Sequence, residues 1–170
     1  MKKIVLISMM LLMTVTSFGY KRVSDNAVVV ADTIYYASNQ KSVLTADQAS
    51  YYRVLLTQGV GLNKEDVFKD YYMDGTLKAE GGYSFVDLSN DKNTVLNGDV
   101  VTYYPNGREK LHGKYVDGQR NGYFTLQLRE GGVAVLKYAN GHSAFDYFMV
   151  TRPDGSQEER PLSEIRSLLQ

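Results

Sequence analysis

Histidine and serine are the residue types whose spacing in this sequence would most directly indicate metal binding or catalysis. The two histidines, His112 and His142, belong to neither a His-x-His nor a His-Glu-x-x-His pattern, so their spacing does not predict a metal site. Ser143, Ser156 and Ser163 lack the flanking glycines that mark the nucleophile of many serine hydrolases. We therefore expect both histidines to be exposed polar residues, and we expect no catalytic serine.

Acidic side chains offer two further chemistries. Asp87, Asn90 and Asp91 lie close together in the sequence, and oxygen ligands of this kind can bind calcium, although their spacing differs from that of an EF-hand loop. A glycan-active enzyme needs two carboxyl groups about 5–10 Å apart in a cleft, which this stretch or Glu158-Glu159 could supply. Gly59 and Gly61 lack the lysine that follows a phosphate-binding loop. We favour a solvated acidic loop, a charged surface at 158–160, no cofactor, no metal and no enzymatic activity.

Composition narrows the classes of partner. The chain has no cysteine, so neither a disulfide framework nor a thiol nucleophile is expected. Its formal net charge is zero, with 19 basic and 19 acidic residues and no basic stripe. Nucleic-acid binding depends on neutralising phosphates, so this balance argues against it, and it equally disfavours a membrane-contact module.

The first residues have the three-part pattern of a secretory signal peptide. Lys2-Lys3 is basic, Ile4 to Val15 is apolar apart from Ser8 and Thr14, and Ser17-Phe18-Gly19 places small residues at a cleavage site. The apolar run is shorter than the roughly 20 residues that a membrane span requires. We expect residues 1–19 to be removed and the product to be periplasmic or secreted, without a lipid anchor, because no cysteine follows the run.

A tyrosine-and-glycine phrase recurs along the chain and predicts its architecture. Copies end at Gly75, Gly107, Gly118 and Gly141, and each begins with a tyrosine three residues earlier, namely Tyr72, Tyr104, Tyr115 and Tyr138. Gly98 and Gly122 are 24 residues apart, as are Gly107 and Gly131. A repeat of this kind indicates one small β unit that is used several times.

Two kinds of glycine are expected in each unit. Asn-Gly and Asp-Gly supply the positive φ angles of tight hairpin turns. Gly81 and Gly113 instead precede Tyr83 and Tyr115 by two residues, so glycine and ring share one face of a strand. The missing side chain leaves a trough for a neighbouring ring, and we expect successive hairpins to stack their aromatic rings, including Phe124.

The remaining elements follow from alternation and turn signals. We expect an N-terminal β-rich lead-in over 20–66, with strands at 28–31 and 33–36, a helical turn at 45–49 and a strand at 51–57. Repeat strands fill 67–158, with a longer hairpin tip at 86–97 and a last strand at 144–151. Leu162, Ile165, Leu168 and Leu169 predict a helix within 159–170 that caps the edge of the sheet.

The repeat resembles the bacterial variant of the MORN repeat, which is found in proteins described as YwqK-like antitoxins. The resemblance is carried by Tyr103-Tyr104-Pro105-Asn106-Gly107, by Gly113-Lys114-Tyr115 and by Gly118-Gln119-Arg120-Asn121-Gly122-Tyr123-Phe124. It is strongest over 97–141 and weak before residue 60. Members commonly have tryptophan where this chain has Phe124, and where its preceding copy has Val100, which suggests a thinner core in that copy.

The resemblance implies an elongated antiparallel β-meander that acts as a scaffold or protein-binding module. An antitoxin that neutralises a partner toxin is the alternative that the family name implies, although the signal peptide points away from the cytoplasm. Alternation along the strands places one member of each tyrosine pair outward, and we expect the binding surface to include Tyr71, Tyr103, Tyr123 and Tyr147. A peptide could also add as a strand to the sheet edge near 144–150.

Overall fold

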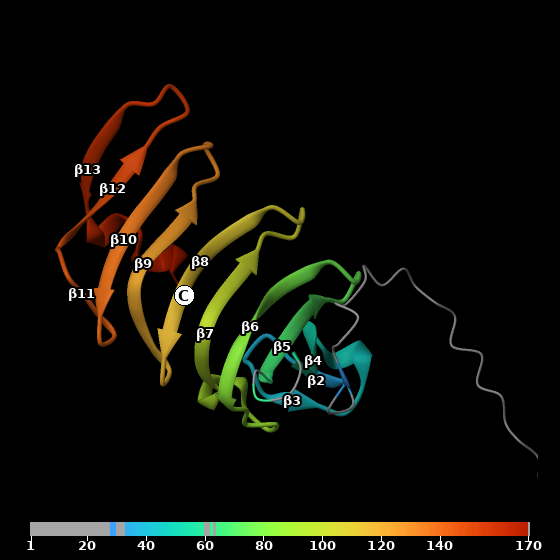
Figure 1. Cartoon of the computed structure of the whole chain (residues 1–170). Helices are drawn as coiled ribbons and strands as arrows, with labels where there is room; N and C mark the ends of the chain where they lie inside the picture. Colours follow the sequence, from blue (N-terminus) through green and yellow to red (C-terminus); the bar gives the residue numbers. More distant parts are fainter. Residues whose placement is uncertain (1–27, 30–32, 60–61, 63, 170) are drawn as a thin grey trace, which may run out of the picture.

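The chain forms one curved antiparallel sheet, seen in a computed structural model that describes residues 28–29, 33–59, 62 and 64–169 (Figure 1). Within the described residues the sheet contains 13 strands, and every pair of neighbours is antiparallel. From β4 to β10 the strands neighbour one another in chain order. The predicted all-β class and the β-meander are therefore confirmed. The predicted signal peptide lies outside the described residues.

The N-terminal strands belong to the same sheet as the repeats. β4 pairs with β2 and with the short β1, and the 3₁₀ turn η1 precedes β4, as the helical-turn prediction for 45–49 requires. The boundary drawn after residue 66 falls inside β5, so the lead-in region is continuous with the repeats. The bounds are β1 Val28–Val29, β2 Ile34–Tyr36, β3 Ser42–Val43, η1 Ala46–Gln48 and β4 Tyr51–Gln58.

The central strands follow the predicted hairpins. The interruption predicted at 86–97 is a connection over 86–94 that contains the 3₁₀ turn η2 and separates β6 from β7, while residues 95–97 already belong to β7. The bounds are β5 Glu65–Tyr72, β6 Leu77–Phe85, η2 Asp91–Asn93, β7 Val95–Tyr103, β8 Glu109–Val116, β9 Gln119–Gln127 and β10 Val133–Ala139.

The C-terminal region corrects two predictions. The strand predicted at 144–151 is β12, but it is not the last one, because β13 pairs with its outer side. The edge predicted near 144–150 is therefore wrong: β12 is paired on both sides, with β10 and with β13. The bounds are β11 His142–Ser143, β12 Tyr147–Thr151 and β13 Gln157–Pro161.

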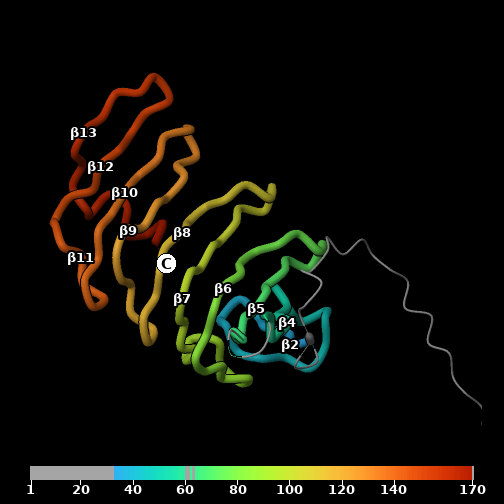
Figure 2. Tube along the Cα trace, viewed as in Figure 1, coloured from blue at the N-terminus to red at the C-terminus, as the bar shows by residue number. Residues whose placement is uncertain are grey.

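The predicted C-terminal helix is also wrong. Two short 3₁₀ turns, η3 Leu162–Glu164 and η4 Arg166–Leu168, follow β13, and the described residues contain no α-helix. Figure 2 shows this end of the chain turning back across the sheet to the level of β8. Ile165 and Leu169 are buried there, so the segment covers a face of the sheet rather than its edge.

The hairpin turns at one end of the strands repeat a single hydrogen-bond pattern. The backbone N–H of Tyr72 donates to the carbonyl of Thr76, and the same bond recurs from Tyr104 to Arg108, from Leu128 to Gly132 and from Arg152 to Ser156. At the other end, both central residues of the Asp117-Gly118 and Asn140-Gly141 turns have positive φ, as predicted for tight hairpins. The unit is therefore regular even where its tyrosine is replaced.

Most buried side chains lie on one surface of the sheet, which we call the core face, whereas Leu56 and Val67 are buried on the opposite surface, where they pair with each other. The core face is marked by Leu55, Phe68, Val100 and Phe124, which pair across neighbouring strands either directly or through Gly81 and Gly113. Eleven buried residues cluster around Phe124 but only four around Val100, in line with the thinner core expected of the earlier copy. Because side chains alternate along a strand, the opposite surface, the outer face, carries the intervening residues.

Candidate binding face

The four tyrosines predicted to bind a partner all lie on the outer face. Tyr71, Tyr103, Tyr123 and Tyr147 belong to β5, β7, β9 and β12, and each is next to a residue that points to the core face. All four are partly or largely exposed. Alternation along paired strands therefore brings residues that are far apart in the sequence onto one surface.

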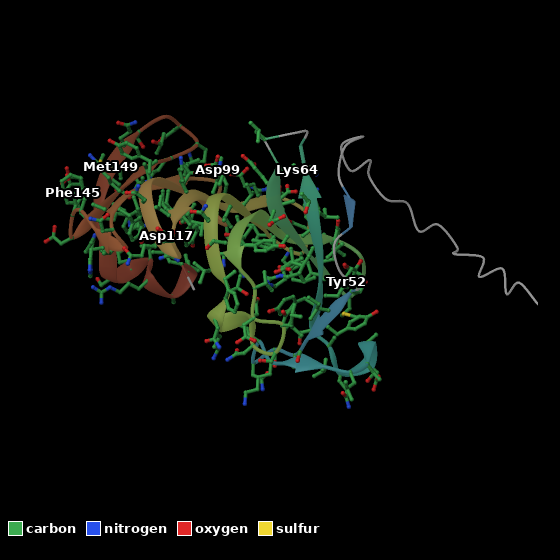
Figure 3. The ribbon with its side chains drawn as sticks, turned by 60° about the horizontal axis from the view of Figure 1, so that its bottom comes forward. Tyr52, Lys64, Asp99, Asp117, Phe145 and Met149 are labelled. Carbon is green, nitrogen blue, oxygen red and sulfur yellow. The ribbon has the colours of Figure 1, made fainter. Side chains whose placement is uncertain are left out.

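One aromatic group lies near the N-terminal end of the outer face. The ring of Tyr52 is 5.1 Å from that of Tyr71 and nearly parallel to it, and 6.2 Å from that of Tyr35. Strand pairing positions these rings, because Tyr52 is the register partner of both Tyr35 and Tyr71. The side chain of Tyr52 lies at one end of the sheet in Figure 3, away from Phe145 and Met149.

The middle of the outer face is more polar. The hydroxyl of Tyr103 donates to Oε1 of Glu80 at 2.7 Å, and Nζ of Lys69 lies 3.0 Å from Oε2 of the same carboxylate. Burial and the hydrogen bond to Glu80 both raise the pKa of Tyr103, so this phenol remains a donor at neutral pH. Tyr103 thus presents its ring on the outer face, while its hydroxyl is hydrogen-bonded to Glu80.

The most exposed aromatic group lies toward the C-terminal end. The side chain of Tyr123 is 66% exposed, and Nζ of Lys137 lies 5.5 Å from its ring centre. The rings of Phe145 and Tyr147 stack at 5.1 Å, and Phe145 is itself 47% exposed. Exposed rings with a polar hydroxyl are enriched where proteins bind one another, because they desolvate easily and still donate.

A shallow hollow lies beside Tyr123. Its volume is about 350 Å³, and Asp99, His112, Asn121 and Thr125 line it together with Tyr123. His112 and His142 are both exposed, as predicted from the sequence. Among the described residues, no three His, Cys, Asp or Glu side chains are grouped so that they could bind a metal ion.

The acidic loop is held by its own hydrogen bonds and by the N-terminal strands. Oδ1 of Asp87 accepts from the backbone and hydroxyl of Ser89, and Oδ2 accepts from Asn93. These bonds lower the pKa of Asp87 to about 2. The N–H of Asp91 donates to the carbonyl of Gln40, so the loop is anchored to the N-terminal region rather than projecting as a free tip.

A buried ionic network was not predicted from the sequence. The guanidinium of Arg53 donates to both carboxylate oxygens of Asp70, at 2.7 and 2.9 Å, and it also binds Asp91. Arg53 and Asp70 are 3% and 2% exposed. The hydrogen bond and charge of Asp70 outweigh the opposing effect of burial and raise the pKa of Arg53, while burial raises the pKa of Asp70. The sequence contained a signal for the burial of Arg53, because this residue alternates in phase with Tyr51 and Leu55.

The residues predicted to build the repeat lie in the hairpin turns, in the strands or among the buried side chains. Tyr72 and Tyr104 donate from their hydroxyls to the carbonyls of Tyr103 and Gln127, which immediately precede the equivalent residue of the next unit. Phe124 is fully buried, and its ring meets those of Tyr115 and Tyr138 edge-on at 5.4 and 5.1 Å. The others lie at turns, in bulged strands or in the core: Gly75, Gly81, Tyr83, Gly98, Gly107, Gly113, Gly118, Gly122 and Gly141.

Comparison with known proteins adds no relative: no protein-family model matches the chain, and neither does any curated protein. No helix of the described residues is long and apolar enough to cross a bilayer.

Proposed function

We propose that the chain is an exported, non-catalytic repeat protein that binds another protein through the tyrosines of its outer face. The observation that carries this proposal is that Tyr71, Tyr103, Tyr123 and Tyr147 share one partly exposed surface, while the opposite surface forms the core. Aromatic side chains supply much of the binding energy in protein interfaces. Export rests on the signal-peptide pattern of residues 1–19.

We further propose that the units are variants of the MORN repeat. The sequence phrases around Gly107 and Gly122 support this, together with the hydrogen-bonded turns that recur at 72–76, 104–108, 128–132 and 152–156. An antitoxin role is the alternative that the same resemblance offers, and it is also a protein-binding role. The two differ in where the partner is found, in the cell envelope or medium for the first and in the cytoplasm for the second.

Site-specific photocrosslinking in the native host tests the proposal. A photoreactive phenylalanine analogue replaces Tyr123, which is 66% exposed on the outer face, and in a matched variant it replaces Glu158, which belongs to the core-face side of β13. We expect a discrete crosslinked protein from the envelope fraction at position 123 only. A Tyr147→Ser substitution in the same protein should weaken that product.

Two results would contradict the proposed function. One is the same product at both positions, which would show that capture does not depend on the outer face. The other is the absence of any product from position 123 in every fraction. A product from the cytoplasmic fraction alone would instead favour the antitoxin alternative.

A further inference from the structure

A cavity on the core face, about 590 Å³ in volume, is lined mostly by residues outside the proposed protein-binding surface, and of the four proposed tyrosines Tyr103 contributes to its lining. The cavity lies where the two clusters of buried residues meet, with the acidic loop on one side and the C-terminal 3₁₀ turns on the other, since Asp91 and Thr94 line it together with Leu168 and Leu169. Volumes of 300–1,000 Å³ are usual for sites that bind small molecules.

The lining of this cavity is strongly basic for a chain with no net charge. Arg53, Lys78, Lys92, Lys110 and Arg120 contribute five basic side chains, whereas Asp70 and Asp91 are the acidic ones. Both carboxylates bind Arg53. The charge of Asp70 also attracts Lys78, so two carboxylates are shared among five basic groups of the lining.

Two β-bulges place a lysine each at the cavity. Between β5 and β6 the register passes from Asp70–Ala79 to Tyr71–Leu77 and leaves Lys78 unpaired. Between β7 and β8 it passes from Thr102–Leu111 to Tyr103–Glu109 and leaves Lys110 unpaired. A bulge redirects side chains locally, so each lysine lines the cavity next to the core residue that follows it.

The two lysines occupy equivalent positions of successive units. They are 32 residues apart, the same spacing as the hairpin-turn residues Tyr72 and Tyr104. The next unit has no bulge at this point: Leu126 pairs with Ala134, which is fully buried and takes the place of the core residues Ala79 and Leu111, so that no residue there corresponds to the lysine. The lysine is thus found only in the units beside the cavity, so the repeat fold itself does not require it.

The environment of Lys110 is electrostatically unfavourable without an anion. Burial and the positive charges of Lys78 and Arg129 lower its pKa. No hydrogen bond or ion pair joins the Lys110 ammonium to another described residue. Nζ of Lys78 lies 4.1 Å from the ring centre of Tyr51, an arrangement that leaves its donors free to bind oxygen.

We propose that this cavity binds a small organic anion, with its carboxylate or phosphate group between Lys78 and Lys110 and its apolar body on Ala79, Val100 and Leu111. These three core residues line the same cavity. A negative group between the ammonium groups relieves their mutual repulsion, and the apolar floor favours an organic ligand over an inorganic ion. The residues that would hold the anion are not among the four proposed binding tyrosines, so the site does not depend on the proposed protein binding.

Isothermal titration calorimetry on the purified protein tests this with three probes that share an apolar body. We expect 2-naphthoate, 2-naphthyl phosphate or both to bind with one-to-one stoichiometry, and neutral 2-naphthalenemethanol to bind at least tenfold more weakly. The preferred anion distinguishes a carboxylate ligand from a phosphate ligand. Binding should also shift the methyl NMR signals of Val100 and Leu111, which places the probe in this cavity.

Three substitutions complete the test. Lys78→Met and Lys110→Met should each weaken anion binding at least tenfold. In Lys110→Met the melting temperature should stay the same or rise, because a half-buried charge is lost. Lys114→Met removes a charge from the same strand on the outer face and should leave affinity unchanged. The proposal is overturned if neither anion binds, if the neutral probe binds equally well, or if folded Lys110→Met retains full affinity.

Discussion

The close contact between Gly113 and Phe124 shows how one residue type fixes the packing of a unit. A Cβ atom at position 113 would lie 2.2 Å from Cδ1 of the fully buried Phe124 ring, so the ring occupies the space that a side chain would fill. Gly113→Ala should therefore lower the free energy of unfolding by about 1–3 kcal/mol, the usual effect of overpacking a core. Urea denaturation measures this change.

The double variant Gly113→Ala/Phe124→Leu is the control for that interpretation. A smaller side chain at position 124 makes room for the added methyl group, so the cost of the pair should be less than the sum of the single costs. Strictly additive costs would contradict the proposed clash. The sequence predicted this trough correctly, because glycine and tyrosine alternate in phase at 113 and 115.

The Arg53–Asp70 ion pair is a feature that the sequence indicates only in part: alternation predicts that each residue is buried, but not that the two bind each other. Arg53→Met leaves the Asp70 carboxylate, 2% exposed, without its bidentate partner, and we expect a loss of about 3–5 kcal/mol in unfolding free energy. Lys69→Met is the matched control, because it removes the partly exposed Lys69–Glu80 pair on the other face of the same strand. That change should cost about 0–1 kcal/mol.

Equal effects of the two substitutions in chemical denaturation would contradict this account. The sequence alone could place Arg53 and Asp70 on the buried faces of β4 and β5 by their phase with neighbouring aromatic residues. It could not pair them, since pairing depends on the register between β4 and β5, which sets Arg53 opposite Asp70.

At the scale of elements, turn signals and alternation predicted the central strands well. The C-terminal segment shows where sequence spacing fails to predict the backbone conformation. Leu162, Ile165 and Leu169 satisfy helical spacing, yet eight residues scarcely support a helix without help from packing. Here the chain must turn back from β13 onto the core face, and two 3₁₀ turns achieve this. Spacing therefore identified the buried residues but not the backbone conformation.

Substitutions in this segment distinguish the two conformations. Ile165 is 1% exposed within the core, so Ile165→Ala should lower the unfolding free energy by about 2–5 kcal/mol. Leu168 would share the buried face of a helix but is 37% exposed here, so Leu168→Ala should have a much smaller effect. Similar losses in urea denaturation for both variants would favour the helix.

The loop over 86–94 makes a prediction about pH. Hydrogen bonds from Ser89 and Asn93 depress the pKa of Asp87 to about 2 in the folded state, below the value of about 3.9 for an unperturbed aspartate. The ionised carboxylate therefore stabilises the fold above about pH 4, and this contribution is lost as the pH falls toward 2. Urea midpoints at pH 5, 3.5 and 2.5 should fall less steeply in Asp87→Asn than in the natural protein. Parallel profiles would contradict this.

For the whole molecule, Tyr115 links the two halves of an open sheet. The clusters around Val100 and Phe124 are separate sets of buried residues, and Tyr115 packs against both. In stacked repeats each unit is stabilised mainly by its neighbours, so cooperative unfolding depends on contacts of this kind. The sequence identified Tyr115 as a repeat residue, but that its ring packs against both clusters is seen only in the structure.

Tyr115→Ala should therefore uncouple the halves. In the natural protein, we expect the slowest-exchanging amides of β5 and of β10 to report the same opening free energy, because both open only with the whole sheet. In the variant, the β5 amides should exchange at a lower free energy than those of β10, because the smaller cluster loses its support. Tyr138→Ala truncates a ring within one cluster and should lower stability while keeping the halves coupled. Native-state hydrogen exchange with equal values for both strands in Tyr115→Ala would show that the backbone ladder alone carries the cooperativity.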